Sequence, residues 1–177
     1  MMTKRFVASI AAFAIALSLA TIPVQAHLMV EQQGTINFKN GGAFLVLSVP
    51  VSAFADADED SDGALSESEL ARNAEKIKQH LQSNVRLLDD AGEALPLQGL
   101  MLSLAHPDDA HAAPAKYVVA LGRFLVEEED AALEFEMALK GAEHEQQHFR
   151  ITTTRQGVSR VLSIAPGRER QALQANQ

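Results

Sequence analysis

The segment LEFEMALK, residues 133–140, carries the clearest structural pattern in the chain. Its apolar side chains occur at every second position, which is the period of a β-strand with one buried face. The segment FLVLSV, residues 44–49, is apolar at nearly every position and predicts a strand covered on both faces. A chain with both patterns is expected to build its core from β-sheets.

Further strand patterns lie on both sides of these two segments. The segments HFRITTT and RVLSIA are separated by Gln156 and Gly157, which predicts a hairpin. Short strands separated by turn residues predict a mainly β protein, an antiparallel β-sandwich of the immunoglobulin-like type. The predicted core residues are Phe44, Val46, Val85, Leu87, Leu102, Val119, Phe135 and Ile151.

One segment, from residue 67 to about residue 83, has a helical period instead. Leu70, Ala74, Ile77 and Leu81 follow one another at spacings of four, three and four residues, which places them on one face of a helix. The sequence therefore predicts a single α-helix inserted between the strands.

Residues 1–26 have the pattern of a signal peptide. Lys4 and Arg5 precede an apolar run over residues 6–20, and Val24 and Ala26 form a small-x-small cleavage pattern. The apolar run is short for a membrane span, although an uncleaved membrane anchor is the alternative. We expect a bacterial periplasmic or secreted protein whose mature chain begins at His27 and has no membrane span.

The rest of the chain predicts one β-sandwich domain over residues 27–166 and a polar C-terminal tail over residues 167–177. Without Lys4 and Arg5, 13 basic residues face 23 acidic residues, a net charge of −10. This charge disfavours nucleic acid and anionic lipid as partners and favours cations or basic proteins. The chain has no cysteine, which excludes disulfides and thiolate metal sites.

The segment DEDSDGALSESE, residues 58–69, concentrates carboxylates around one glycine. Asp58, Asp60 and Asp62 alternate along it, so a tight turn can direct their oxygens at one centre. Gly63 allows the chain to reverse with a positive φ. A hard divalent cation takes about six to eight oxygen ligands. The alternative, a solvated acidic turn, leaves like charges crowded without a counter-ion, so we predict a metal site.

This segment resembles the calcium-binding loop of the EF-hand family, D-x-D-x-D-G-x-L-x-x-x-E, at every key position. A register starting at Asp56 fails, because it puts Ser61 at the turn and Gly63 where the apolar anchor belongs. The resemblance implies a single EF-hand over residues 54–83 that binds Ca²⁺. The implied calcium ligands are Asp58, Asp60, Asp62, the Ala64 carbonyl, Ser66 through a water, and Glu69 with both carboxylate oxygens.

Further residues in the loop and before it complete this prediction. Phe54 is the expected apolar anchor before the loop, and Leu65 is expected to fix the loop to the core. Because Pro50 cannot lie inside a helix, the arm that enters the loop should be short. Ser66 and Glu69 also form the S-x-x-E pattern of a helix capping box.

A broader resemblance covers residues 26–126. A processed N-terminal histidine, two strands, the acidic loop with its helix and then VRLLDDAGEALPL are together similar to the periplasmic ectodomain of nickel/cobalt permeases of the hydrogenase- and urease-accessory type. Those permeases continue into membrane helices and this chain does not. The resemblance implies a stand-alone relative of the ectodomain, a metal-handling or partner-binding accessory protein.

The histidines offer a second kind of metal site. His27, as a first residue, would carry a free amine and an imidazole, which can chelate copper(II) or nickel when a second histidine comes close. His144 and His148 face each other only on a helix, and the strand patterns around them favour a solvated turn instead. We therefore do not expect a zinc or nickel site at His144 and His148.

These observations predict a binding protein and not an enzyme. The sequence has no nucleophile elbow, phosphate loop or zinc-protease helix motif, so no catalytic residue and no organic cofactor are expected. In the first hypothesis, Ca²⁺ rigidifies the inserted helix and supports an interaction surface for a protein partner in the cell envelope. In the alternative, the chain is a transition-metal accessory protein that uses His27.

Overall fold

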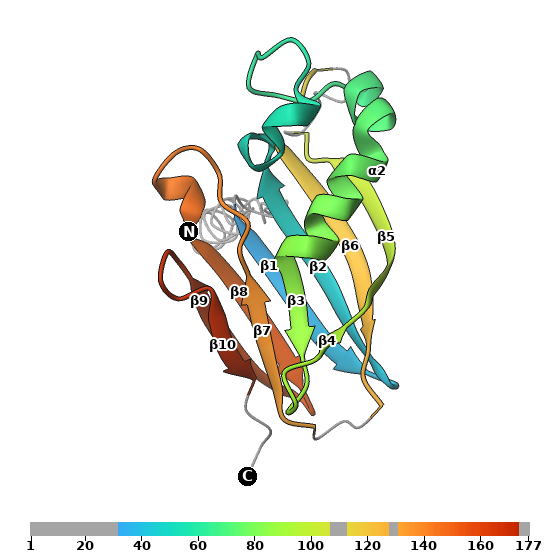
Figure 1. The fold of residues 1–177 in the computed structure, drawn as a ribbon, viewed down its shortest axis with the longest axis vertical. Coiled ribbons are helices and arrows are strands. Elements are labelled where there is room, and N and C mark those ends of the chain that lie inside the picture. Colours follow the sequence, from blue (N-terminus) through green and yellow to red (C-terminus); the bar gives the residue numbers. More distant parts are fainter. Residues whose placement is uncertain (1–31, 107–112, 128–130, 174–177) are drawn as a thin grey trace, which may run out of the picture.

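The computed structural model describes residues 32–106, 113–127 and 131–173. In these residues two β-sheets face each other across one hydrophobic core. The four-stranded sheet and the helix α2 (Glu67–Asn84) together cover one face of the six-stranded sheet (Figure 1). The predicted mainly β, sandwich-like fold with one inserted α-helix is confirmed for these residues.

The larger sheet has the strand order β5-β6-β2-β1-β8-β9. Its strands are β1 (Gln33–Lys39), β2 (Gly42–Pro50), β5 (Leu97–Leu104), β6 (Tyr117–Leu125), β8 (Phe149–Arg155) and β9 (Val158–Ile164). The β1–β2 turn contains Asn40 and Gly41, both with positive φ, as a tight hairpin requires. The predicted β8–β9 hairpin is confirmed. One pair departs from the antiparallel prediction, because β1 and β8 run parallel.

The smaller sheet has the strand order β10-β7-β3-β4. Its strands are β3 (Val85–Leu88), β4 (Ala94–Leu95), β7 (Leu133–Met137) and β10 (Arg170–Leu173). Leu133, Phe135 and Met137 are buried in β7, and the glutamates between them lie on the other face. The alternating pattern of this segment thus specifies which face of the smaller sheet packs against the core.

Residues 170–173, which lie in the predicted polar C-terminal tail, are part of the smaller sheet. These residues form β10, which pairs antiparallel with β7, and Leu173 is buried. A strand this short and polar has little signal of its own. It forms because β7 offers an unpaired edge to which it can add.

Four of the eight predicted core residues, Val85, Leu87, Phe135 and Ile151, are fully buried, and Leu102 packs against the core while partly buried. The prediction is wrong for Phe44, Val46 and Val119, which lie on the less buried faces of their strands. In β2 the large apolar side chains that are buried are those of Leu45, Leu47 and Val49, whereas Phe44 is 42% exposed. A strand that is apolar at nearly every position does not specify which of its two faces is buried in the core. A shift of one residue exchanges the two faces.

The helix α2 is positioned by its apolar side and its caps. Leu70, Ile77 and Leu81 are buried in the same core as the sheets. The short 3₁₀ helix η1 (Val51–Ala57) follows β2 directly, and a second, η2 (Glu145–Gln147), precedes β8. In the described part of the chain, no helix has the length and apolar character needed to cross a membrane.

Candidate metal centre

The acidic loop connects η1 to α2 at one end of the sandwich, beyond the end of β2 (Figure 1). Pro50 has φ −63° and ψ 142° and ends β2, so the chain enters η1 without a long helix. Within η1, Phe54 has non-helical φ and ψ of −126° and 44° and is buried. The entering arm is therefore short and anchored by Phe54, as the sequence predicts.

The loop turns where the glycine stands. Gly63 has φ +80°, the left-handed region that glycine adopts without steric cost. The backbone N–H of Gly63 donates to Asp58 Oδ2 at 2.9 Å, and the Ala64 N–H donates to Asp62 Oδ1 at 2.8 Å. The Asp62 N–H lies 3.2 Å from both Asp58 Oδ1 and Asp60 Oδ1. Loop N–H groups thus hold the carboxylates on the inner side of the turn.

Leu65 fixes the end of the loop to the sandwich. Its side chain is completely buried, and its backbone forms an isolated bridge with Ala115, with N–H···O distances of 2.8 and 2.9 Å. The predicted anchoring role of Leu65 is confirmed. Ala115, just before β6, is a partner that no local sequence pattern indicates.

Glu69 is the third residue of α2 and forms a complete capping box with Ser66, the residue before the helix. Glu69 Oε2 accepts from the Ser66 hydroxyl at 2.7 Å and from the Ser66 backbone N–H at 2.9 Å, and Oε1 accepts from the Glu59 N–H at 3.0 Å. The hydrogen bonds from the Ser66 side chain and backbone lower the pKa of Glu69 to about 2, with the Glu59 bond adding to them against desolvation. Glu69 is therefore a carboxylate at any physiological pH.

Three of the predicted ligands converge. Asp58, Asp60 and Glu69 each place a carboxylate oxygen within 4.8 Å of the other two. Asp62 is not part of this group, and its Oδ1 accepts from the Ala64 N–H instead. Ser66 contributes its hydroxyl to the helix cap. The predicted roles of the Ala64 carbonyl and of a Ser66-bound water stay predictions.

The electrostatics of the group favour a cation. The Asp62 N–H lowers the pKa of Asp60, but desolvation and repulsion from Asp62, Glu69 and Asp58 outweigh it, and the pKa is raised. Arg72 forms a two-bond ion pair with Glu59, at 2.9 and 3.1 Å, and Glu59 is not one of the three converging residues. Carboxylate oxygens with mutual repulsion fit a hard divalent cation, which would remove that repulsion.

Asn73 is a residue of the site region that the sequence analysis missed. It lies one turn after Glu69 on α2 and is 3% exposed. Its Nδ2 is 2.9 Å from Glu59 Oε1, 3.1 Å from the Glu69 carbonyl oxygen and 3.3 Å from the Ala57 carbonyl oxygen. Asn73 thus joins η1, the loop and α2. Its position three residues after Leu70 and four before Ile77, on the apolar side of the helix, was the available signal.

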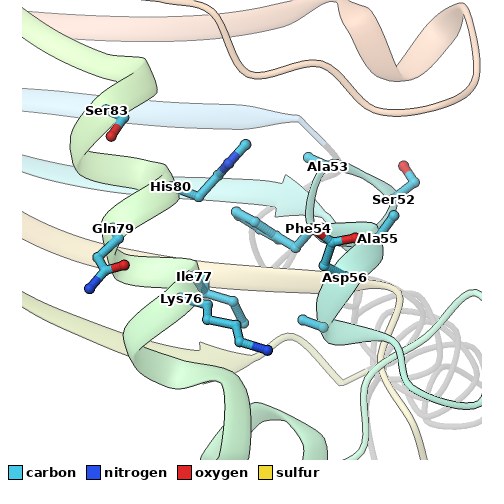
Figure 2. A pocket seen from close by; sticks show the side chains of 11 residues that line it. Ser52, Ala53, Phe54, Ala55, Asp56, Lys76, Ile77, Gln79, His80 and Ser83 are labelled. Carbon is cyan, nitrogen blue, oxygen red and sulfur yellow. The ribbon is translucent and has the colours of Figure 1, made fainter.

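A pocket of about 520 Å³ lies between η1 and α2 (Figure 2). Phe54 points from η1 toward α2, and His80 and Ile77 point back from α2 (Figure 2). The rings of Phe54 and His80 meet edge to face with centroids 5.8 Å apart. Asp56 and Lys76 add opposite charges to the pocket lining. The two arms of the loop are therefore also the two walls of the pocket.

Comparison of the chain with protein-family models and with curated proteins found no match. The resemblance of residues 58–69 to an EF-hand loop and that of residues 26–126 to a permease ectodomain therefore stay predictions. His27, on which the alternative transition-metal hypothesis depends, lies outside the described residues.

Proposed function

We propose that this protein is an exported calcium-binding protein in which one EF-hand loop holds α2 against η1 and so orders a binding surface. The observation that carries the proposal is the convergence of Asp58, Asp60 and Glu69 within 4.8 Å, in a loop with the full EF-hand pattern. Asp58 directly follows η1, whereas Glu69 lies in the first turn of α2. An ion bound to both would tie the two arms together.

Calcium is the cation that this donor set supports best. The proposed ligands are all oxygens, which suits Ca²⁺ or Mg²⁺ over softer transition ions. A glutamate at the twelfth position offers two oxygens to one ion, and this suits the larger Ca²⁺ over Mg²⁺. Extracellular calcium modules bind with Kd of about 10⁻⁴–10⁻³ M, and four carboxylates place this loop at that range or tighter.

A structural role follows from the shape of the entering arm. A calcium sensor opens two long helices to expose a groove. Here the entering arm is a seven-residue 3₁₀ helix whose Phe54 is buried, and Leu65 pairs with Ala115 of the sandwich. Such an arm has little freedom to swing. Bound calcium would instead keep both walls of the pocket in place for a protein partner in the cell envelope.

The test is calcium titration by calorimetry on a matched pair of variants, Asp58→Asn and Asp56→Asn. Both remove one negative charge, but only Asp58 belongs to the converging group. We expect Asp58→Asn to weaken calcium binding about tenfold or more, whereas Asp56→Asn should change it about twofold at most.

The variant Glu69→Gln removes a proposed ligand charge and keeps an acceptor for the capping box. It should weaken binding at least as much as Asp58→Asn, with the circular dichroism of the fold unchanged. Absence of calcium binding in the parent protein would overturn the proposal. A greater loss in Asp56→Asn than in Asp58→Asn would show that the loop uses the other register.

A further inference from the structure

Two histidines, His144 and His148, lie at the turn between β7 and β8. The imidazole rings of His144 and His148 are 5.0 Å apart between centroids, with an angle of 53° between their planes. The strand patterns on both sides of these residues predict a solvated turn, in which the two rings would not face each other. The structure places η2 between them, with His144 as its N-cap at φ −58° and ψ −42°, and this helical turn brings the two rings to the same side.

The hydrogen bonding of His148 leaves one ring nitrogen with a lone pair for a metal. His148 Nδ1 lies 3.1 Å from the carbonyl oxygen of His144. A carbonyl oxygen only accepts, so Nδ1 carries the proton and the neutral ring has its lone pair on Nε2. Metal-binding histidines usually hold their second nitrogen in such a bond to a carbonyl or carboxylate, which fixes the tautomer and the ring orientation.

The turn itself is held from several sides, so its geometry does not depend on a bound ion. Gln146, between the two histidines, accepts from the Ser52 hydroxyl at 2.6 Å, and its backbone carbonyl accepts from the Gly141 N–H at 3.1 Å. A Cβ added at Gly141 would lie 2.4 Å from Gln146 Cβ and 2.9 Å from Pro50 Cγ. A glycine is therefore required for this close approach, and the turn is fixed against β2 and η1.

Both histidines are exposed, and Glu143 and Glu145 on the same turn are exposed as well. Their negative charges raise the local concentration of cations at the turn. An exposed pair is accessible to an ion from solution and to a partner that would remove it. These properties differ from those of a closed structural zinc site, which surrounds the ion with four protein ligands.

We propose that His144 and His148 together bind one divalent transition-metal ion of the class Ni²⁺, Cu²⁺ or Zn²⁺. Imidazole nitrogen suits these ions, whereas Ca²⁺ and Mg²⁺ prefer oxygen. Two protein ligands leave the other coordination positions open to water or to groups of a partner. The site is therefore an exchangeable capture site, separate from the carboxylate loop and independent of the calcium proposal.

The test uses Ni²⁺ as the probe, with Ca²⁺ in excess to occupy the carboxylate loop. In the parent protein, Ni²⁺ is expected to broaden the imidazole proton NMR signals of His144 and His148 first and together, because the ion is paramagnetic. Spectra of His144→Gln and His148→Gln assign these signals. If the signals of another histidine, such as His27, broaden first, the proposal is overturned.

Calorimetry with Ni²⁺ gives the second readout. Loss of either imidazole should weaken binding about tenfold or more, since a chelate becomes a single contact. The matched control His80→Gln removes an imidazole from α2 and should change the affinity about twofold at most. Unchanged Ni²⁺ affinity in both turn variants would overturn the proposal. Both turn residues are exposed, so these variants should fold, and circular dichroism checks this.

Discussion

Asn73 provides the sharpest test of how the acidic loop is held between η1 and α2. Its buried Nδ2 contacts the Ala57 carbonyl of η1, the Glu59 carboxylate of the loop and the Glu69 carbonyl of α2. The substitution Asn73→Ala removes all of these contacts and leaves the backbone otherwise unchanged. It should separate η1 from α2 at the point where the loop begins.

The magnitude follows from the donors and acceptors. Nδ2 carries two protons, so it makes about two full hydrogen bonds at a time. Water can replace the contact with the exposed Glu59, so only the bonds to the Ala57 and Glu69 carbonyls are counted. Each contributes about 1 kcal/mol, so Asn73→Ala should lower the free energy of unfolding by about 2 kcal/mol. That corresponds to roughly 30-fold in the unfolding equilibrium.

The assay is urea unfolding followed by circular dichroism, first with a calcium chelator present. Gln79→Ala, at an exposed position of the same helix, is the matched control and should change stability by less than about 0.5 kcal/mol. If Asn73→Ala costs no more than the control, Asn73 does not join the arms and the reasoning is refuted. With calcium added, both proteins should gain stability, because the ion would bind only the folded loop, and the difference between them should not shrink.

Gly63→Ala should lower the free energy of unfolding by about 1–2 kcal/mol. Gly63 has a φ of +80° and an added Cβ would meet nothing within 4 Å, so backbone strain alone causes the loss. Unchanged stability in urea would mean that the loop turns at another residue. Folding lowers the pKa of Glu69 from its ordinary value of 4.5 to about 2. Without calcium, the stability that Glu69 contributes should therefore be complete above pH 4.5 and disappear as the pH falls toward about 2. The urea unfolding curves of the parent and of Glu69→Gln should accordingly approach each other as the pH is lowered from about 6 to about 3. Leu173→Asp should destabilise the protein by about 2 kcal/mol or more, because it buries a charge in β10. The control variant Ala172→Asp, at the exposed neighbouring position, should not. Equal melting temperatures of the two variants would refute the place of β10 in the sheet.

The sequence predicted the local features of the acidic loop well. The positive φ of Gly63, the capping box of Ser66 and Glu69, and the short arm after Pro50 all appear as expected. Each of these depends on the conformational limits of one residue or on hydrogen bonds between near neighbours. The burial of Leu65 followed from the same loop pattern, although its partner Ala115 did not.

The sequence could not specify the features that depend on residues far apart in the chain. Which face of β2 is buried in the core, and the parallel pairing of β1 with β8, depend on the strands that lie beside them. The strand β10 forms only because β7 has an edge to pair with. In the same way, Asn73 acquires its role from the carbonyl of Ala57, which lies 16 residues earlier.

The two candidate metal sites divide along the same line. The carboxylate loop consists of twelve consecutive residues, so the sequence alone predicts its pattern of oxygens and its turn. The pair His144 and His148 depends on a helical turn that hydrogen bonds from Ser52 and Gly141 to Gln146 hold in place. Local geometry determined the first site, whereas packing between distant segments decided the second.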